Sequence, residues 1–256
     1  IPESHNYPGF FGIARQELLR RLNAQARQFG AELLSGRVTS LRKEGETFVA
    51  TCSGVDYNAR FILLATGLVD CCPPIEGQRE NCPSEAIRFC PICDGYEAID
   101  RRVGVLGDIK AGGKKALFLR TYTKDVSLFL TNETIEDAGS REKLTQADVK
   151  IVGQLAKICQ ATERSVTVRT QGGGNHEVDA LYPALGCTVR SDLATGLGAS
   201  SSEDGNLEVD DHQRTSIDGL YAAGDVVTDL HQLSVAFGHA AIAATDIHNR
   251  LPANPR

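Results

Sequence analysis

Cys90 and Cys93 stand three positions apart in the segment Cys-Pro-Ile-Cys, and Asp94 follows them directly. Two intervening residues allow the sulfurs of such a pair to meet in a disulfide, and a helix beginning at the motif would lower the pKa of its thiolate. We therefore interpret Cys90 and Cys93 as a redox pair. Asp94 is placed to exchange a proton with a departing thiolate, although an exposed or helix-capping aspartate is an equally good interpretation.

Zinc binding is the competing interpretation of this cysteine pair. A Cys-Pro-x-Cys segment is also suited to hold half of a tetrahedral zinc site, but the site then needs two more ligands. The chain has eight cysteines and six histidines, and none of the other cysteines repeats this spacing. We therefore favour redox exchange over zinc and predict no metal ligand.

A glycine-containing turn lies between an apolar segment that ends at Leu106 and a predicted helix. Strand, turn and helix in this order are typical of a loop that binds the phosphates of a dinucleotide. Gly107 and Gly112 satisfy the first and third glycine positions of that fingerprint. Ile109 stands at the second, where we expect its side chain to fill the space through which the backbone approaches a pyrophosphate. The turn is either a candidate NAD(P) loop or a structural β-α turn.

The elements that must position these residues alternate between strands and helices. Apolar segments typical of buried strands lie at 61–65, 103–106, 126–130 and 219–222. Helical spacing of apolar residues marks 16–29, 113–122 and 232–250. Shorter segments with partial strand alternation lie at 31–34, 36–41 and 47–52. The β-α-β order across 102–130 is the rhythm of a nucleotide-binding sheet and indicates an α/β fold.

The composition excludes several classes of function. With 41% hydrophobic and 23% charged residues, the chain lies in the ordinary globular range. A net charge of -6 with acidic and basic residues interleaved offers no basic stripe for nucleic acid. No apolar run is long enough to cross a bilayer, and the charged start at 1–10 is not a signal peptide. We expect no nucleic-acid partner, no membrane and a cytoplasmic location.

Several segments together resemble the thioredoxin reductase-like family of FAD-dependent pyridine nucleotide-disulfide oxidoreductases (class II), in the family's order along nearly the whole chain. HNYPGF at 5–10 is similar to the family segment beside the flavin, and ATG at 65–67 to its central motif. CPICDG at 90–95 resembles the active-site segment. TSIDGLYAAGD at 215–225, followed by His-Gln-Leu and an alanine-rich helix, resembles the closing flavin-binding signature.

The resemblance implies a fold of two Rossmann-like, three-layer ββα domains, the second inserted in the first. Residues 1–86 and 190–256 would form the FAD-binding domain, and 87–189 an NAD(P)-binding-like domain that carries the redox pair. Gly107 and Gly112 are its candidate NAD(P)-binding residues.

The resemblance also assigns roles to single residues. Cys90 and Cys93 would shuttle between dithiol and disulfide, with Asp94 as the acid that serves them and Cys93 facing the flavin. The residues expected to line FAD are Asn6, Val38, Thr66, Gly67, Asp225, His231, Gln232 and Leu233. Asp225 would accept a hydrogen bond from the ribityl chain, and the helix that begins near His231 would stabilise negative charge on the reduced flavin.

The chain departs from the family pattern at three places. The family's N-terminal strand and G-x-G-x-x-G loop, which hold the FAD pyrophosphate, do not precede Ile1, and N-terminal truncation is the simplest account. If the chain as given is the whole protein, we expect it to bind FAD weakly or not at all. Ile109 replaces the second glycine of the dinucleotide loop. Glu133 stands where the family carries a basic cluster for the 2′-phosphate of NADPH, and its charge would repel that phosphate.

The leading hypothesis is an enzyme: an FAD-dependent, thioredoxin reductase-like oxidoreductase that passes electrons between flavin, the Cys90 and Cys93 disulfide and a substrate. That substrate is a thioredoxin-like protein or a small-molecule disulfide or dithiol, and the resemblance implies a homodimer. NAD(P)H is a possible donor, but Ile109 and Glu133 count against NADPH, and NADH, another reductase or reversal of the electron flow toward oxygen stay open. One alternative is an FAD-dependent dithiol oxidase that uses oxygen. The other is a non-catalytic fragment or zinc-stabilised binding module.

Overall fold

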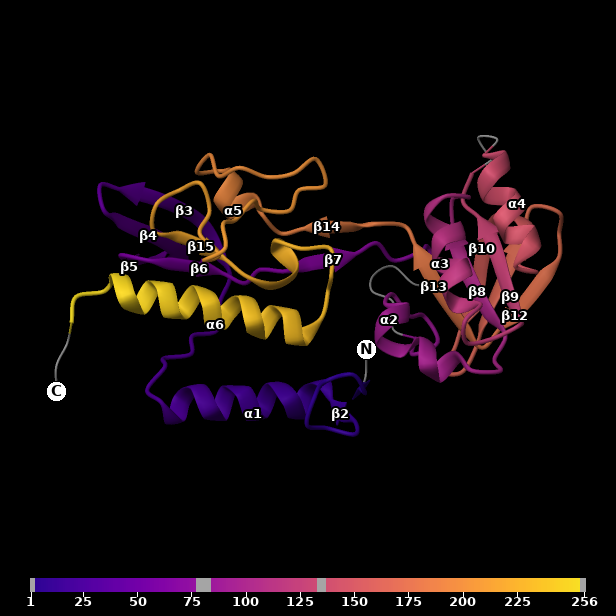
Figure 1. Ribbon diagram of the computed structural model, residues 1–256, viewed down its shortest axis with the longest axis horizontal. Helices are drawn as coiled ribbons and strands as arrows, with labels where there is room; N and C mark the ends of the chain where they lie inside the picture. Colours follow the sequence, from indigo (N-terminus) through magenta and orange to yellow (C-terminus); the bar gives the residue numbers. More distant parts are fainter. Residues whose placement is uncertain (1–2, 77–83, 133–136, 254–256) are drawn as a thin grey trace. The chain divides into compact units, whose positions relative to one another are not determined.

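A computed structural model describes residues 3–76, 84–132 and 137–253 (Figure 1). The described residues form two compact units. The first contains Ile1–Leu19 and Asp70–Gly186, and the second contains Arg20–Val69 and Cys187–Arg256. The predicted α/β character is confirmed. The predicted limits of the inserted domain, 87 and 189, stay a prediction.

The core of the first unit is a mixed sheet. Within the described residues its strands are β8 (Val103–Gly107), β9 (Val126–Leu130), β10 (Lys150–Ala161), β11 (Val166–Thr170), β12 (Asn175–Val178) and β13 (Ala180–Ala184). Their order in the sheet is β12-β11-β10-β9-β8-β13. The pairs of β13 with β8, β8 with β9, and β9 with β10 are parallel, whereas β10, β11 and β12 pair antiparallel.

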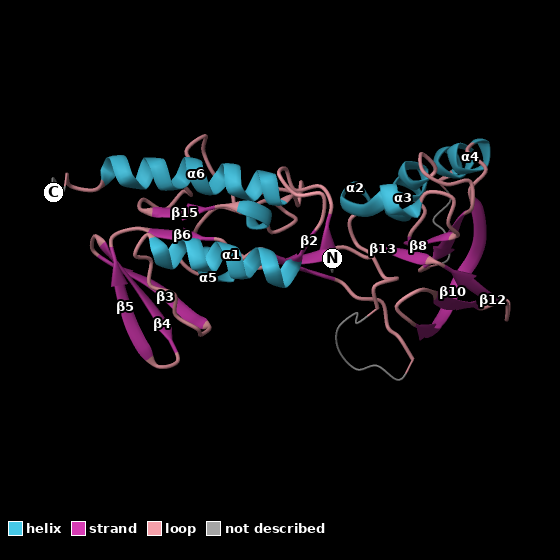
Figure 2. Ribbon diagram, turned by 90° about the horizontal axis from the view of Figure 1, so that it is seen from below, coloured by secondary structure: helices cyan, strands magenta, loops and turns pink. Residues whose placement is uncertain are grey.

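Both faces of this sheet are buried, which explains the continuous apolar run of β8. Val103 and Val105 join one core cluster, and Leu106 joins a second cluster on the opposite face. Helices α3 (Ala111–Leu119) and α4 (Ala138–Gln146) cover one face of the sheet (Figure 2). The β8-α3-β9 unit therefore confirms the β-α-β order expected from the sequence.

Short elements complete the first unit. The cysteine pair lies at the start of α2 (Pro91–Asp94), which continues into the 3-10 helix η1 (Gly95–Ala98). A small hairpin of β1 (Glu3–Ser4) and β2 (Ile13–Ala14) belongs to the same unit. Helix α1 (Arg15–Gln28) begins in the residues assigned to this unit and ends in those of the second.

The second unit combines an antiparallel meander with a short parallel pair. Its strands and helices are β3 (Val38–Glu44), β4 (Thr47–Cys52), β5 (Val55–Ala59), β6 (Ile62–Leu64), β7 (Leu68–Asp70), β14 (Cys187–Val189), α5 (Asp192–Thr195), β15 (Leu220–Ala222), η2 (Gly224–Val226) and α6 (Leu233–Arg250). Strands β3, β4 and β5 form the meander, and β6 runs parallel to β15. Residues 31–37 form no strand, so the strand expected at 31–34 is wrong.

A carboxylate in α6 fixes this helix against β15. The Tyr221 hydroxyl donates a hydrogen bond of 2.5 Å to Asp246, and the Arg214 guanidinium donates to both oxygens of the same carboxylate. The Arg214 hydrogen bonds, followed by that of Tyr221, lower the pKa of Asp246. These contacts orient α6 and thereby its N-terminus, which lies at the candidate flavin site.

Among the helices that the structure describes, none combines the length and apolar character needed to cross a bilayer. The 18 residues of α6 include His239, Asp246 and Arg250, which interrupt its apolar character.

Candidate functional site

Cys90 and Cys93 are joined in a disulfide with a Cα–Cα distance of 5.3 Å. Cys90 caps the N-terminus of α2, with Pro91 in the first helical turn, and its carbonyl accepts a hydrogen bond of 2.9 Å from the Cys93 amide. Proline suits this position because its fixed φ is already helical and its missing N–H is not needed there. The local sequence thus positions the pair for disulfide formation. A disulfide leaves neither sulfur as a zinc-binding thiolate.

Asp94 is buried, at 4% exposure, although it follows a partly exposed disulfide. The Tyr182 hydroxyl on β13 donates a hydrogen bond of 2.8 Å to its Oδ1 atom, and a guanidinium nitrogen of Arg88 lies 3.7 Å from Oδ2. Burial raises the pKa of Asp94, while Tyr182 and Arg88 oppose the rise. Asp94 makes no side-chain cap, so the exposed or capping interpretation is wrong.

The polar contacts around Asp94 continue to the N-terminal segment. Arg88 donates a hydrogen bond of 2.7 Å to Glu97, and the other Glu97 oxygen lies 2.7 Å from Nδ1 of His5. Partial burial would raise the pKa of Glu97, but the His5 and Arg88 hydrogen bonds outweigh it and lower that pKa. His5 belongs to the HNYPGF segment. Within the first unit this segment therefore contacts η1, the 3-10 helix that follows the cysteines.

A half-buried lysine supports the chain just before the disulfide. Nζ of Lys115 in α3 donates hydrogen bonds of 3.0 Å to the Phe89 carbonyl and 2.6 Å to the Pro183 carbonyl. Burial lowers the pKa of Lys115. Because Phe89 precedes Cys90 and Pro183 follows Tyr182, the Lys115 side chain connects the residue before the disulfide to the end of β13.

Apolar side chains flank the disulfide on the surface. Ile92, between the two cysteines, is 57% exposed, and Tyr96, just after the motif, is 77% exposed. Gly95 is required here, because a Cβ at this position would lie 2.9 Å from the Tyr122 ring. Two exposed apolar side chains therefore lie beside the disulfide in the sequence.

The closing signature in the second unit fits a flavin. Strand β15 leads into Gly224, which has φ +78°, and a Cβ added there would meet Ala236 of α6 at 3.3 Å. Asp225 is partly exposed and has no hydrogen bond or ion pair with the described residues. Gln232 is the N-cap residue of α6, and its side chain makes no capping hydrogen bond to the helix. A free carboxylate beside a helix N-terminus suits a hydroxylated chain that leads to an electron-accepting ring.

The other predicted flavin residues are distributed between the units. Thr66 and Gly67 follow β6, where Thr66 donates a hydrogen bond of 2.7 Å to the Arg190 carbonyl and Gly67 has φ +65°. Val38 begins β3, in the same unit as Thr66 and Asp225. Asn6 belongs to the first unit, where its side-chain oxygen accepts a hydrogen bond from Ser4.

The glycine turn after β8 is a close-packed β-α connection. A Cβ on Gly107 would lie 3.0 Å from Cα of Gly112, so these glycines allow α3 to approach the strand. Ile109 is 5% exposed and belongs to the core cluster, so our expectation that it fills the pyrophosphate space is wrong. Asp108 Oδ1 accepts hydrogen bonds of 2.7 Å from both the Lys110 and Ala111 amides. Glu133 lies outside the described residues.

The sequence did not indicate Arg88, Lys115 or Tyr182, because their contacts with the redox segment arise only when strands and helices distant in the chain come together. The contacts of Asp108, in contrast, could have been predicted from the sequence. An aspartate just before a helix commonly accepts hydrogen bonds from its first amides.

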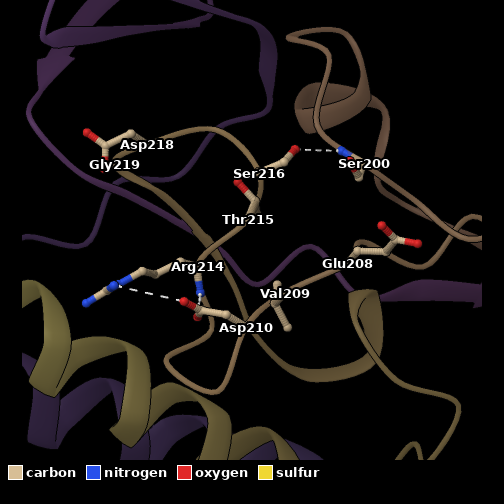
Figure 3. A pocket seen from close by; sticks show the side chains of 9 residues that line it. All are labelled: Ser200, Glu208, Val209, Asp210, Arg214, Thr215, Ser216, Asp218 and Gly219. Atoms are coloured by element: carbon tan, nitrogen blue, oxygen red, sulfur yellow. Dashed lines mark hydrogen bonds and ion pairs between the residues drawn. The ribbon is translucent and has the colours of Figure 1, made fainter.

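A surface pocket of about 450 Å³ lies in the second unit (Figure 3). Its side chains include Arg214 together with the acidic Glu208, Asp210 and Asp218. It contains no predicted site residue, so we assign it no part in the redox chemistry. Among the described residues, no three His, Cys, Asp or Glu side chains are grouped to hold a metal ion.

Comparisons with known proteins agree with this geometry. The family model of the pyridine nucleotide-disulphide oxidoreductases matches residues 5–243. A thioredoxin reductase from Streptomyces coelicolor is 27% identical over 263 residues, covering 95% of this chain and 79% of the relative. One from Streptomyces clavuligerus is 29% identical over 261 residues, covering 97% and 80%. The crystal structure of HlmI matches with a TM-score of 0.87 at 26% identity, covering 97% of this chain and 79% of HlmI.

The α/β fold, the Cys90–Cys93 disulfide and these relatives define a flavoprotein thiol-disulfide oxidoreductase. The chain belongs to the pyridine nucleotide-disulphide oxidoreductase family. Within it, the chain is an FAD-dependent, thioredoxin reductase-like enzyme, which confirms the resemblance.

Proposed function

We propose that Cys90 and Cys93 exchange electrons with a thioredoxin-like protein or a small disulfide, and that Asp94 is the acid that serves their thiols. The observation that carries this proposal is the partly exposed disulfide at the start of α2 with the buried Asp94 carboxyl beside it. FAD, when bound, supplies a two-electron carrier for this disulfide. The exposed Ile92 and Tyr96 provide an apolar contact for the partner.

The thiol chemistry proceeds by two exchanges in the reducing direction. A thiolate of the reduced pair attacks one sulfur of the partner disulfide, and the other partner sulfur leaves as a thiolate and takes a proton. The second cysteine then displaces the partner, which takes a second proton, and re-forms the Cys90–Cys93 disulfide. The partner gains two electrons and two protons. The raised pKa of Asp94 suits a carboxyl that holds and delivers such a proton.

We assign the flavin to Thr66, Gly67, Asp225 and the segment 231–233, with Val38 and Asn6 as further lining residues. The Asp225 carboxylate, which has no partner among the described residues, and the α6 N-terminus support this assignment. We also propose a cytoplasmic homodimer that binds neither nucleic acid nor membrane. The net charge of -6 supports the exclusion of nucleic acid.

The test begins with the chain reduced by dithiothreitol and freed of reductant under anaerobic conditions. The chain is mixed with oxidised thioredoxin, or separately with glutathione disulfide, and the new thiols are counted by alkylation. We expect thiols on at least one substrate, with Cys90→Ser/Cys93→Ser as the inactive control. Reduction of glutathione disulfide alone would restrict the substrate to small molecules. If neither substrate is reduced, the proposal fails.

A second candidate function is a dithiol oxidase, in which a dithiol reduces Cys90–Cys93 and oxygen is the final acceptor. The hydrogen bonds of Asp108 to the Lys110 and Ala111 amides favour it, because they occupy donors that a nicotinamide dinucleotide would use. Dithiol-dependent oxygen consumption with added FAD is its expected signature. Oxidation of NADPH in the absence of any dithiol would count against it.

A further inference from the structure

The N-terminus of α3 is the place where a Rossmann-like domain receives a dinucleotide. In such domains the pyrophosphate accepts hydrogen bonds from amides at the start of the first helix, and the helix dipole favours its negative charge. In this chain the two amides are those of Lys110 and Ala111. One oxygen of Asp108 accepts from both, at 2.7 Å each.

The Asp108 carboxylate resembles a phosphate oxygen in charge and in the donors it uses. It is supplied by the residue directly after β8, so it is tethered to the loop and its effective concentration at the amides is high. A pyrophosphate that approached the same amides would have to displace it and would also be repelled by its charge. The negative charge of Asp108 and its occupation of the two amides therefore both oppose pyrophosphate binding.

The rest of the turn offers no compensating space. Gly107 and Gly112 are already in close contact. The exposed Lys110 is a cation beside the loop, but Asp137 at the start of α4 interacts with its charge. The residues present therefore do not fit the pyrophosphate of NADH or NADPH.

We infer that Asp108 is an intramolecular substitute for the dinucleotide pyrophosphate, and that it closes this loop to NADH and NADPH. The inference rests on the proposed function in one respect, since it treats the loop as the counterpart of the family's nucleotide site.

Calorimetric titration of the chain with NADH and with NADPH tests the inference. The wild-type chain is expected to bind neither at millimolar nucleotide. Asp108→Gly frees both amides and removes the charge, so its affinity should rise by about tenfold or more. Asp108→Asn removes the charge but keeps an acceptor, and a smaller gain is expected. Circular dichroism confirms that each variant is folded, and Asp108→Asn serves as the test if Asp108→Gly is not.

Asp210→Gly is the matched control. One Asp210 oxygen also accepts from two backbone amides, those of His212 and Arg214, but in the second unit. This variant should bind no nucleotide. Micromolar binding by the wild-type chain would overturn the inference, and so would a folded Asp108→Gly that gains no affinity. Thiol counts after dithiothreitol treatment report separately on the proposed function, because an inert Cys90–Cys93 disulfide would reject that function and leave the nucleotide result intact.

Discussion

The Tyr182 hydroxyl donates a hydrogen bond of 2.8 Å to Oδ1 of Asp94. Tyr182 has no exposed surface and lies on β13, whereas Asp94 ends the short helix that carries the cysteines. The bond therefore connects the central sheet directly to the acid beside the disulfide. Burial raises the pKa of Tyr182, and the Asp94 charge adds to the rise, so the hydroxyl keeps its proton and remains a donor.

Replacing Tyr182 by phenylalanine should destabilise the protein and should also raise the pKa of Asp94. The buried carboxyl loses a donor, so we expect a loss of about 1–3 kcal/mol in the free energy of unfolding near neutral pH. The pKa of Asp94 should rise further, because this hydrogen bond opposes the effect of burial. Urea unfolding and the pH profile of disulfide exchange measure the two effects. Tyr122→Phe, a ring beside Gly95, is the control, and equal effects of both variants would contradict the role of Tyr182.

Asp94→Asn should flatten the dependence of stability on pH. The raised pKa means that the folded protein binds this proton more tightly than the unfolded chain. The stabilisation that comes from this proton is complete below pH 3.8, the ordinary pKa of the carboxyl. It is lost as the pH rises through the raised pKa that Asp94 has in the folded protein. Urea unfolding of wild type and variant across this window should show the steeper fall in the wild type. The variant should also exchange thiols more slowly at unchanged flavin content, whereas collapse of its fold would favour a structural role.

Cys93→Ser should abolish turnover and leave any FAD bound, because the cysteine transfers electrons and does not hold the cofactor. Flavin absorbance after gel filtration reports cofactor content, and reduction of glutathione disulfide reports turnover. Cys159→Ser, at a free and partly buried cysteine of the same unit, should keep wild-type activity. Retained activity in Cys93→Ser would remove this residue from the mechanism.

Lys115→Met should loosen the segment before Cys90. The Phe89 and Pro183 carbonyls lose their common donor, at an expected cost of about 1–3 kcal/mol in the free energy of unfolding. Reduction of Cys90–Cys93 by dithiothreitol should change in rate, because the start of α2 is less firmly held. Lys114→Met removes the exposed neighbouring charge and should have little effect. A similar stability and rate in the two variants would show that Lys115 has no positioning role.

Local patterns were sufficient to predict the disulfide, the β8-α3-β9 unit and α6. Each depends on spacing within a short segment, such as the two residues between Cys90 and Cys93. The environment of Asp94 could not be predicted in this way, since Tyr182 reaches it from a strand 88 positions later. Ile109 shows a different limit: the sequence pattern gives its place in the fingerprint, but burial in the core decides where the side chain points.

The amide contacts of Asp108 also affect how the first unit becomes ordered. A helix start that relies on a bound phosphate has unsatisfied amides until the ligand arrives, so its stability depends on ligand supply. Here the chain provides the acceptor itself, and the first turn of α3 is complete as soon as the polypeptide folds. Maturation of this unit is therefore independent of nicotinamide nucleotide levels.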